Sequence, residues 1–180
     1  SMISSKCVLT AAHCIHLSKA SQFQVVGGAT YLGSGGDWVK VQNIIVPTGY
    51  NETTIHMDMA VLKLEREVAG TKTIPLCSTT IPDGAKVKVS GWGKTSEGGN
   101  GSAQVRSVEL LKVNKKTCRK NFEFVNPISR SMMCASNEGT NGNKNACNGD
   151  SGGPLVYNNQ VCGIVSWSVG CARSGYPGVY

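Results

Sequence analysis

Residues 144–155 read KNACNGDSGGPL and crowd glycines around a single serine, Ser151. Glycines on both sides of a serine allow the backbone to turn tightly around it. Such a turn can aim the backbone N–H groups of Gly149 and Ser151 at one point, as in an oxyanion hole beside a nucleophilic serine. A lone Gly-x-Ser-x-Gly segment is equally compatible with an ordinary surface loop, so the rest of the chain has to decide.

Two further segments each hold one candidate for chemistry next to an apolar strand. Residues 7–14 read CVLTAAHC, where two small alanines precede His13 and leave room for its ring in a crowded site. Residues 57–64 read MDMAVLKL, where Asp58 stands at the mouth of an alternating apolar strand. A carboxylate entering a core needs a partner, because an unpaired buried charge is costly. Taken singly, an ordinary histidine and a capping aspartate remain the alternatives.

Strand patterns run through the chain, and no segment with a helical period is long. We expect strands at 23–26, 38–41, 44–46, 86–89, 105–113, 155–157 and 161–167, and a short helix over 115–122. Prolines, a cysteine and a glycine mark residues 75–85 as a connector. The sequence therefore predicts one all-β domain over 1–180, with an N-terminal half over 1–74 and a C-terminal half over 86–180.

Cysteine content points to an oxidising compartment. The chain has 8 cysteines in 180 residues, and none forms the Cys-x-x-Cys pair of a zinc site. Asn51-Glu52-Thr53 and Asn100-Gly101-Ser102 are acceptors for N-glycosylation. No apolar run approaches the roughly 20 residues that span a bilayer. We predict a secreted, extracellular protein without a membrane span, and no residue pattern calls for a metal or another cofactor.

The charge balance is basic. Lys and Arg number 18 against 11 Asp and Glu, which gives a net charge of +7 and a pI near 9.0. The densest basic run consists of Lys112, Lys115, Lys116, Arg119 and Lys120. A polyanion patch is one interpretation, but no aromatic residues interleave with these cations as base-stacking platforms would. We interpret the run as a solvated face and expect no nucleic-acid partner.

The three candidate residues occur in the order His13, Asp58, Ser151, inside LTAAHC, DMAVLKL and GDSGGP, with GWG at 91–93 and VSW at 165–167. In these blocks and this order the sequence resembles the chymotrypsin-like (trypsin-fold) serine proteases over essentially its whole length. The resemblance implies two antiparallel β-barrels with the active site in the cleft between them, His13 and Asp58 lying in the first and Ser151 in the second.

The same resemblance implies a secreted serine endopeptidase, made as a zymogen and acting as a monomer. It implies protein or peptide substrates, and proteinaceous inhibitors as further partners. Ser151 would attack the scissile carbonyl, His13 would carry the proton and Asp58 would orient the imidazole; this is the established scheme of that family. A non-catalytic homologue that binds partners is the alternative.

By resemblance, the primary specificity pocket involves Asn145, Ser166, Ser168 and Gly178. Trypsin-like pockets carry an aspartate where this chain has Asn145, and an amide cannot offset the desolvation of a cationic side chain. Gly178 leaves room for a large side chain, whereas Ser168 can narrow the entrance. We therefore expect a chymotrypsin-like preference for aromatic or large apolar residues, with trypsin-like specificity as the alternative.

The resemblance also implies two disulfides, Cys118–Cys134 and Cys147–Cys171. It pairs Cys14 with a cysteine upstream of Ser1, and it leaves Cys7, Cys77 and Cys162 without assigned partners. Measured against the family, 1–180 looks partial at both ends, and we expect such a piece to fold poorly or to be inactive by itself. By the same resemblance, the N-terminus that zymogen activation releases would precede Ser1, and its charged amine would pair with Asp150.

Overall fold

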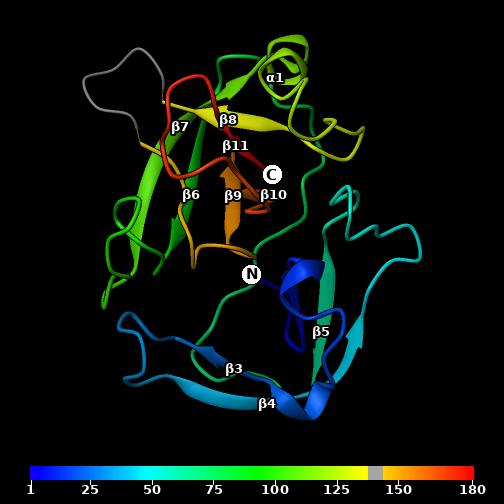
Figure 1. Cartoon of the computed structure of the whole chain (residues 1–180). Helices are drawn as coiled ribbons and strands as arrows, with labels where there is room; N and C mark the ends of the chain where they lie inside the picture. The colour runs from blue at the N-terminus through cyan, green and yellow to red at the C-terminus, as the bar shows by residue number, and fades with distance from the viewer. Residues whose placement is uncertain (138–143) are drawn as a thin grey trace.

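The computed structural model describes residues 1–137 and 144–180, and in it the chain forms two antiparallel β-sheets. The first sheet has the strand order β1-β2-β5-β4-β3 and the second β10-β9-β6-β7-β8-β11. Figure 1 shows β3, β4 and β5 in the lower half of the molecule, and the second sheet with the helix α1 in the upper half. Each sheet curls around its own core, so the prediction of an all-β chain in two antiparallel half-barrels is confirmed.

The strands of each sheet come from one half of the chain. The first sheet consists of β1 (Met2–Ser4), β2 (Cys7–Thr10), β3 (Gln24–Gly27), β4 (Asp37–Ile45) and β5 (Ala60–Leu64), with 3-10 turns at Ala12–Cys14 and Ala20–Gln22. The second consists of β6 (Lys86–Gly91), β7 (Arg106–Val113), β8 (Cys134–Ser136), β9 (Pro154–Tyr157), β10 (Gln160–Ile164) and β11 (Gly178–Val179), with α1 (Lys115–Asn121) after β7. Within the described residues, no helix is long and apolar enough to span a membrane.

Alternating side chains explain why the longer strands form where they do. In β6, Val87 and Val89 are buried while Lys86 and Lys88 are exposed, which is the period of two expected for a sheet with one covered face. The pattern in β4 is broken by a register shift between Val41 and Asn43. The sequence therefore predicted two strands, 38–41 and 44–46, where the structure has one bulged strand.

The ends of the chain's shorter strands were not predictable from pattern. β1, β8 and β11 have only two to three residues, too few for alternation to show. The strand expected over 161–167 ends at Ile164, because Val165 and Ser166 leave the ladder and pair with Gly152, Gly153 and Val179 instead. After Ile164 the chain therefore leaves the sheet and runs toward Asp58, to which Ser166 is hydrogen-bonded.

The helix α1 begins at a well-defined cap. The Asn114 side chain accepts hydrogen bonds from the backbone N–H groups of Lys116 and Thr117. The Lys115 ammonium donates to the carbonyls of Ser129, Arg130 and Met132, and Lys112 pairs with Asp83. Two of the five cations in the predicted basic run are thus occupied within the fold. The interpretation of that run as a solvated face stays a prediction.

Backbone hydrogen bonds join the loop between β3 and β4, in the first half, to the segment before β7, in the second half. The Leu32 N–H donates to the Ala103 carbonyl over 2.7 Å, and the Val105 N–H donates to the Thr30 carbonyl over 2.9 Å. The Trp92 indole N–H donates to the same Thr30 carbonyl over 3.0 Å. Such bonds restrict how far the halves can move relative to each other.

The structure contains three disulfides. Two are Cys118–Cys134 and Cys147–Cys171, the pairs implied by the resemblance. The third, Cys77–Cys162, joins the connector to β10, where Leu76 also forms a parallel bridge with Val161. Cys7 and Cys14 have free thiols in the structure. The third disulfide therefore anchors the connector on the second sheet.

We expect the double substitution Cys77→Ala and Cys162→Ala to lower the free energy of unfolding by about 4 kcal/mol. The two cysteines are 85 residues apart, and opening so long a loop restores much chain entropy to the unfolded state. Urea denaturation followed by fluorescence measures the change. Glu109→Gln, which breaks the exposed Lys86–Glu109 pair, serves as control and is expected to leave the midpoint of denaturation unchanged. Equal stabilities of the double mutant and the parent would contradict the anchoring role.

Candidate active site

The pairing of β2 with β5 brings His13 to Asp58. Thr10 lies opposite Ala60 at the end of this ladder, so the turn after β2 and the residue before β5 meet at one edge of the sheet. The His13 ring nitrogen Nδ1 lies 2.6 Å from Asp58 Oδ2, and the His13 backbone N–H donates to Asp58 Oδ1 over 2.8 Å. The two residues therefore form one hydrogen-bonded unit.

A third donor to Asp58 comes from the other sheet. The buried Ser166 hydroxyl donates to Asp58 Oδ2 over 2.6 Å. The side chain of Asp58 is only 3% exposed, so all three donors act on a desolvated carboxylate. Sequence reasoning placed Ser166 in the specificity pocket and missed this bond. A buried acid requires donors, but nothing in the local pattern says which distant hydroxyl supplies one.

Opposing influences set the protonation of this pair. Burial alone would raise the pKa of Asp58, but hydrogen bonds from His13 and Ser166 bring it below 3.8. The hydrogen bond that His13 donates to Asp58, followed by the contact with Cys14, raises the pKa of His13 from 6.5 to about 10. The site thus stabilises an imidazolium beside a carboxylate.

Ser151 lies at the tip of the glycine-rich turn and lines a pocket of about 230 Å³. Ser166, Trp167, Ser168 and Gly178 line the same pocket. No hydrogen bond joins Ser151 to His13 among the described residues, and His13 Nε2 lies 3.6 Å from Cys14 Sγ. Of the three candidate residues, the structure therefore joins His13 and Asp58 directly, and places Ser151 on the pocket that Ser166 shares.

The turn around Ser151 leaves two backbone donors unused. Among the described residues, no acceptor faces the N–H of Gly149 or of Ser151, whereas their neighbours Asp150 and Gly152 donate to Cys147 and Val165. Gly149 has φ +95°, and a Cβ there would lie 3.1 Å from Gly93 Cα. Glycine is needed at this position both for its backbone angle and for the close approach.

Asn145 and Tyr180 meet beside the pocket: Tyr180 lines the pocket itself, whereas Asn145 lines the neighbouring cavity of about 820 Å³. Asn145 Oδ1 accepts hydrogen bonds from the Ala146 N–H over 2.8 Å and from the Tyr180 hydroxyl over 3.1 Å. A Cβ on Gly178 would lie 2.5 Å from the same oxygen, so Gly178 closes over it. Sequence analysis missed Tyr180. Burial raises the pKa of its hydroxyl, which stays a neutral donor.

The other predicted pocket residue, Ser168, turns its hydroxyl away to the carbonyl of Gly170, over 2.6 Å. Asp150 next to the candidate nucleophile accepts from the backbone N–H groups of Gly93 and Cys147, over 2.8 and 3.0 Å. It lines a second cavity of about 820 Å³. No group of three or more His, Cys, Asp or Glu side chains that could hold a metal ion occurs in residues 1–137 and 144–180.

Comparison with known proteins agrees with this architecture. The model of the trypsin family matches residues 1–180. Trypsin alpha-4 of Lucilia cuprina is 40% identical over 184 residues, covering 100% of this chain and 71% of that protein. Seminase of Drosophila melanogaster is 42% identical over 177 residues, covering 96% of this chain and 63% of that protein. Trypsin alpha of Drosophila melanogaster is 39% identical over 185 residues, covering 100% and 71%.

Two curled β-sheets, a His–Asp pair with a buried aspartate and a serine in a glycine-rich turn on the adjoining pocket define a serine-type endopeptidase. The match over the whole chain makes its family plain: the chain belongs to the trypsin family.

We expect Ser166→Ala to lower the free energy of unfolding near pH 7 by about 1.5–3 kcal/mol, because it removes a hydrogen bond to a buried charged group. The pKa of Asp58 lies below its ordinary 3.8, so this stabilisation is present above pH 3.8 and is lost as the pH falls through the folded-state pKa. Urea denaturation at pH 7 and near pH 2 measures both effects. Ser168→Ala, whose hydroxyl bonds only a carbonyl, is the control; a Ser166→Ala deficit that does not depend on pH would refute the link to Asp58.

Proposed function

We propose that the protein is an extracellular endopeptidase in which Ser151, His13 and Asp58 form the catalytic triad, and that it prefers aromatic or large apolar residues before the scissile bond. The observation that carries the triad is the 2.6 Å hydrogen bond from His13 to a desolvated Asp58, next to the pocket that Ser151 lines. The Cys77–Cys162, Cys118–Cys134 and Cys147–Cys171 disulfides support an extracellular location.

In this scheme His13 takes the proton from the Ser151 hydroxyl as its oxygen attacks the scissile carbonyl. The imidazole must be neutral before the attack and becomes an imidazolium afterwards, and Asp58 stabilises that cation. Since Asp58 raises the pKa of His13, kcat/KM rises with pH through a limb that lies above 6.5. His13 then gives its proton to the leaving amine, and water hydrolyses the acyl-enzyme by the reverse sequence.

The unused N–H groups of Gly149 and Ser151 would bind the oxyanion of each tetrahedral intermediate. Donors of this kind, already oriented before the reaction, stabilise charge that develops only in the transition state. The backbone N–H groups of Gly93 and Cys147 donate hydrogen bonds to the Asp150 carboxylate and hold the turn that presents these donors. Asp150 would thereby position the turn without touching the substrate.

The preference for a neutral side chain rests on Asn145. Its oxygen is already shared by the Ala146 N–H and the Tyr180 hydroxyl, and it carries no charge to compensate a buried Lys or Arg. Relatives named trypsins keep tryptic cleavage open as the alternative. We expect a monomer that acts on proteins or peptides and meets proteinaceous inhibitors, with no nucleic-acid or membrane partner.

We expect Ser151→Ala to abolish peptide hydrolysis, by about 10⁶-fold in kcat as in other serine proteases, while leaving the fold intact. The alanine removes the oxygen that forms the acyl-enzyme and disturbs no buried contact, since Ser151 is exposed. Hydrolysis of peptide p-nitroanilides and far-UV circular dichroism of the naturally processed protein measure activity and fold. Near-normal turnover by this variant would contradict the triad assignment. A parent that is folded but inactive would favour the alternative, a non-catalytic homologue that binds partners.

We expect Asn145→Asp to raise kcat/KM for substrates with Arg before the scissile bond by at least tenfold relative to substrates with Phe. The carboxylate keeps both hydrogen bonds that the amide oxygen accepts and adds the charge that a cation requires. Cleavage of a mixed peptide library, with sites identified by mass spectrometry, measures the preference. Asn148→Asp, which places a carboxylate on the pocket that Ser151 lines, is the control for a general change in charge. A parent that already cuts after Arg would overturn the pocket interpretation.

A further inference from the structure

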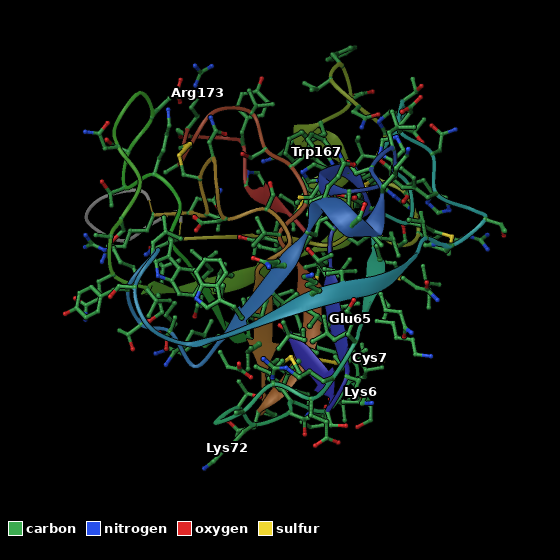
Figure 2. All side chains as sticks on the ribbon, turned by 90° about the horizontal axis from the view of Figure 1, so that it is seen from below. Lys6, Cys7, Glu65, Lys72, Trp167 and Arg173 are labelled. Carbon is green, nitrogen blue, oxygen red and sulfur yellow. A yellow bond between two sulfur atoms is a disulfide. The ribbon has the colours of Figure 1, made fainter. Side chains whose placement is uncertain are left out.

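Glu97 lies in a hairpin over residues 94–101 and contacts a loop more than seventy positions further along the chain. Its Oε2 accepts from the Arg173 Nε over 2.9 Å and from the Cys171 backbone N–H over 3.0 Å. Its Oε1 pairs with Arg173 Nη2. Both carboxylate oxygens thus bind the planar guanidinium, and one of them also accepts a backbone hydrogen bond. In Figure 2, Arg173 and Trp167 both lie at the upper side of the view, opposite Lys6 and Lys72.

The backbone of the receiving loop is shaped to admit this carboxylate. Gly170 has φ +65°, and a Cβ there would lie 2.3 Å from Glu97 Oε2 and 2.4 Å from Arg173 Nε. A side chain here would displace one or both partners of the ion pair and would also require an unfavourable backbone angle. The loop therefore has a glycine at the point where the carboxylate approaches the backbone.

The same loop continues directly into a wall of the primary pocket. Ser168, which lines the pocket, donates its hydroxyl to the Gly170 carbonyl over 2.6 Å. Cys171, whose N–H binds Glu97, forms the disulfide with Cys147 on the opposite wall. A displacement of residues 170–173 would consequently reach the pocket through Ser168.

The first residue of the hairpin, Lys94, is hydrogen-bonded to the segment that precedes Ser151. The Lys94 N–H donates to the carbonyl of Asn148 over 2.8 Å, and Asn148 lines the pocket. Lys94 also bridges to Gly101, which closes the hairpin. Residues 94–101 therefore connect the segment at Asn148 to the loop at Cys171, the two segments that the Cys147–Cys171 disulfide also joins.

Isolated exposed ion pairs contribute little to stability, and Glu97 and Arg173 are 44% and 55% exposed. This pair differs in its fork geometry, which fixes direction as well as distance. Hydrogen bonds from Arg173 and Cys171 lower the pKa of Glu97 to about 2, so the carboxylate stays ionised wherever the enzyme would work. Its role concerns geometry more than stability.

We propose that Glu97 and Arg173 are a positioning pair that holds the wall of the primary specificity pocket at its working width, and so help to determine which side chains the enzyme accepts. The inference rests on the proposed function of that pocket. Neither residue touches the substrate; both act through residues 168–171.

The test replaces Glu97 by Gln, which keeps the size of the side chain and removes its charge. Substrates are peptide p-nitroanilides with Phe or Ala before the scissile bond. Phe fills the pocket, whereas Ala depends little on its width. We expect kcat/KM for Phe to fall about tenfold or more, mainly through KM, because a wall displaced by a fraction of an ångström loses contacts with a large side chain. Hydrolysis of the Ala substrate should change less than twofold.

The chain offers a matched control in Asp37, the first residue of β4. Asp37 pairs with Arg66 through both oxygens, at 2.6 and 2.7 Å, and accepts from the Ala69 N–H over 2.8 Å. Its pKa is likewise lowered to about 2. The architecture is the same, but it lies in the first sheet. Asp37→Asn should therefore leave the Phe-to-Ala ratio unchanged, even where it costs as much thermal stability as Glu97→Gln.

Labelling of Ser151 by diisopropyl fluorophosphate separates the possible failures. A parent that neither reacts with this reagent nor cleaves any substrate refutes the proposed function. The proposed positioning pair alone is refuted if the parent reacts and distinguishes Phe from Ala substrates, and the Glu97→Gln variant has the same Phe-to-Ala ratio of kcat/KM. Where Glu97→Gln does not fold, Arg173→Gln and Arg173→Lys take its place, and Lys keeps the charge but not the forked hydrogen bonds. A Phe-to-Ala ratio of kcat/KM for Arg173→Lys between those of the parent and Arg173→Gln supports the proposal. Parental ratios for both variants overturn it.

Discussion

The buried carboxylate of Asp58 is the constraint on which the rest of this structure depends. A carboxylate with a side chain only 3% exposed has lost its water and must recover hydrogen bonds from protein donors. Two of these come from His13 in the first sheet and one from Ser166 in the second. The acid therefore orients the imidazole and also joins the two halves of the molecule at the point where chemistry would occur.

The same rule organises the other side of the pocket. Asp150 and Asn145 are largely enclosed acceptors, and each is satisfied by two donors from nearby chain segments. The backbone approaches both side chains closely at glycines. A Cβ at Gly93 would lie within 2.7 Å of Asp150, and one at Gly178 would lie 2.5 Å from Asn145 Oδ1. The glycine-rich composition of this half thus follows from packing backbone against polar side chains as much as from turns.

Ties between distant segments then give the pocket its shape. Cys147–Cys171 joins its walls covalently, and the hairpin over 94–101 crosses the same gap through Lys94 and Glu97. Directly after this hairpin, backbone bonds of Leu32 and Val105 hold the loop between β3 and β4 against the segment before β7. A pocket built from loops can be selective only if such contacts limit their motion.

By itself, the sequence determined what depends on neighbouring residues. Alternation in β6 and β7, the short helix after β7 and the segments around His13, Asp58 and Ser151 could all be identified without coordinates, because each is encoded within a few positions. Only the tertiary structure decided that Ser166 donates to Asp58, that Tyr180 meets Asn145, that Cys77 pairs with Cys162 and that Glu97 reaches Arg173. These contacts join residues 35 to 108 positions apart. No local period encodes such a separation, since it is the packing of two sheets that brings the partners together.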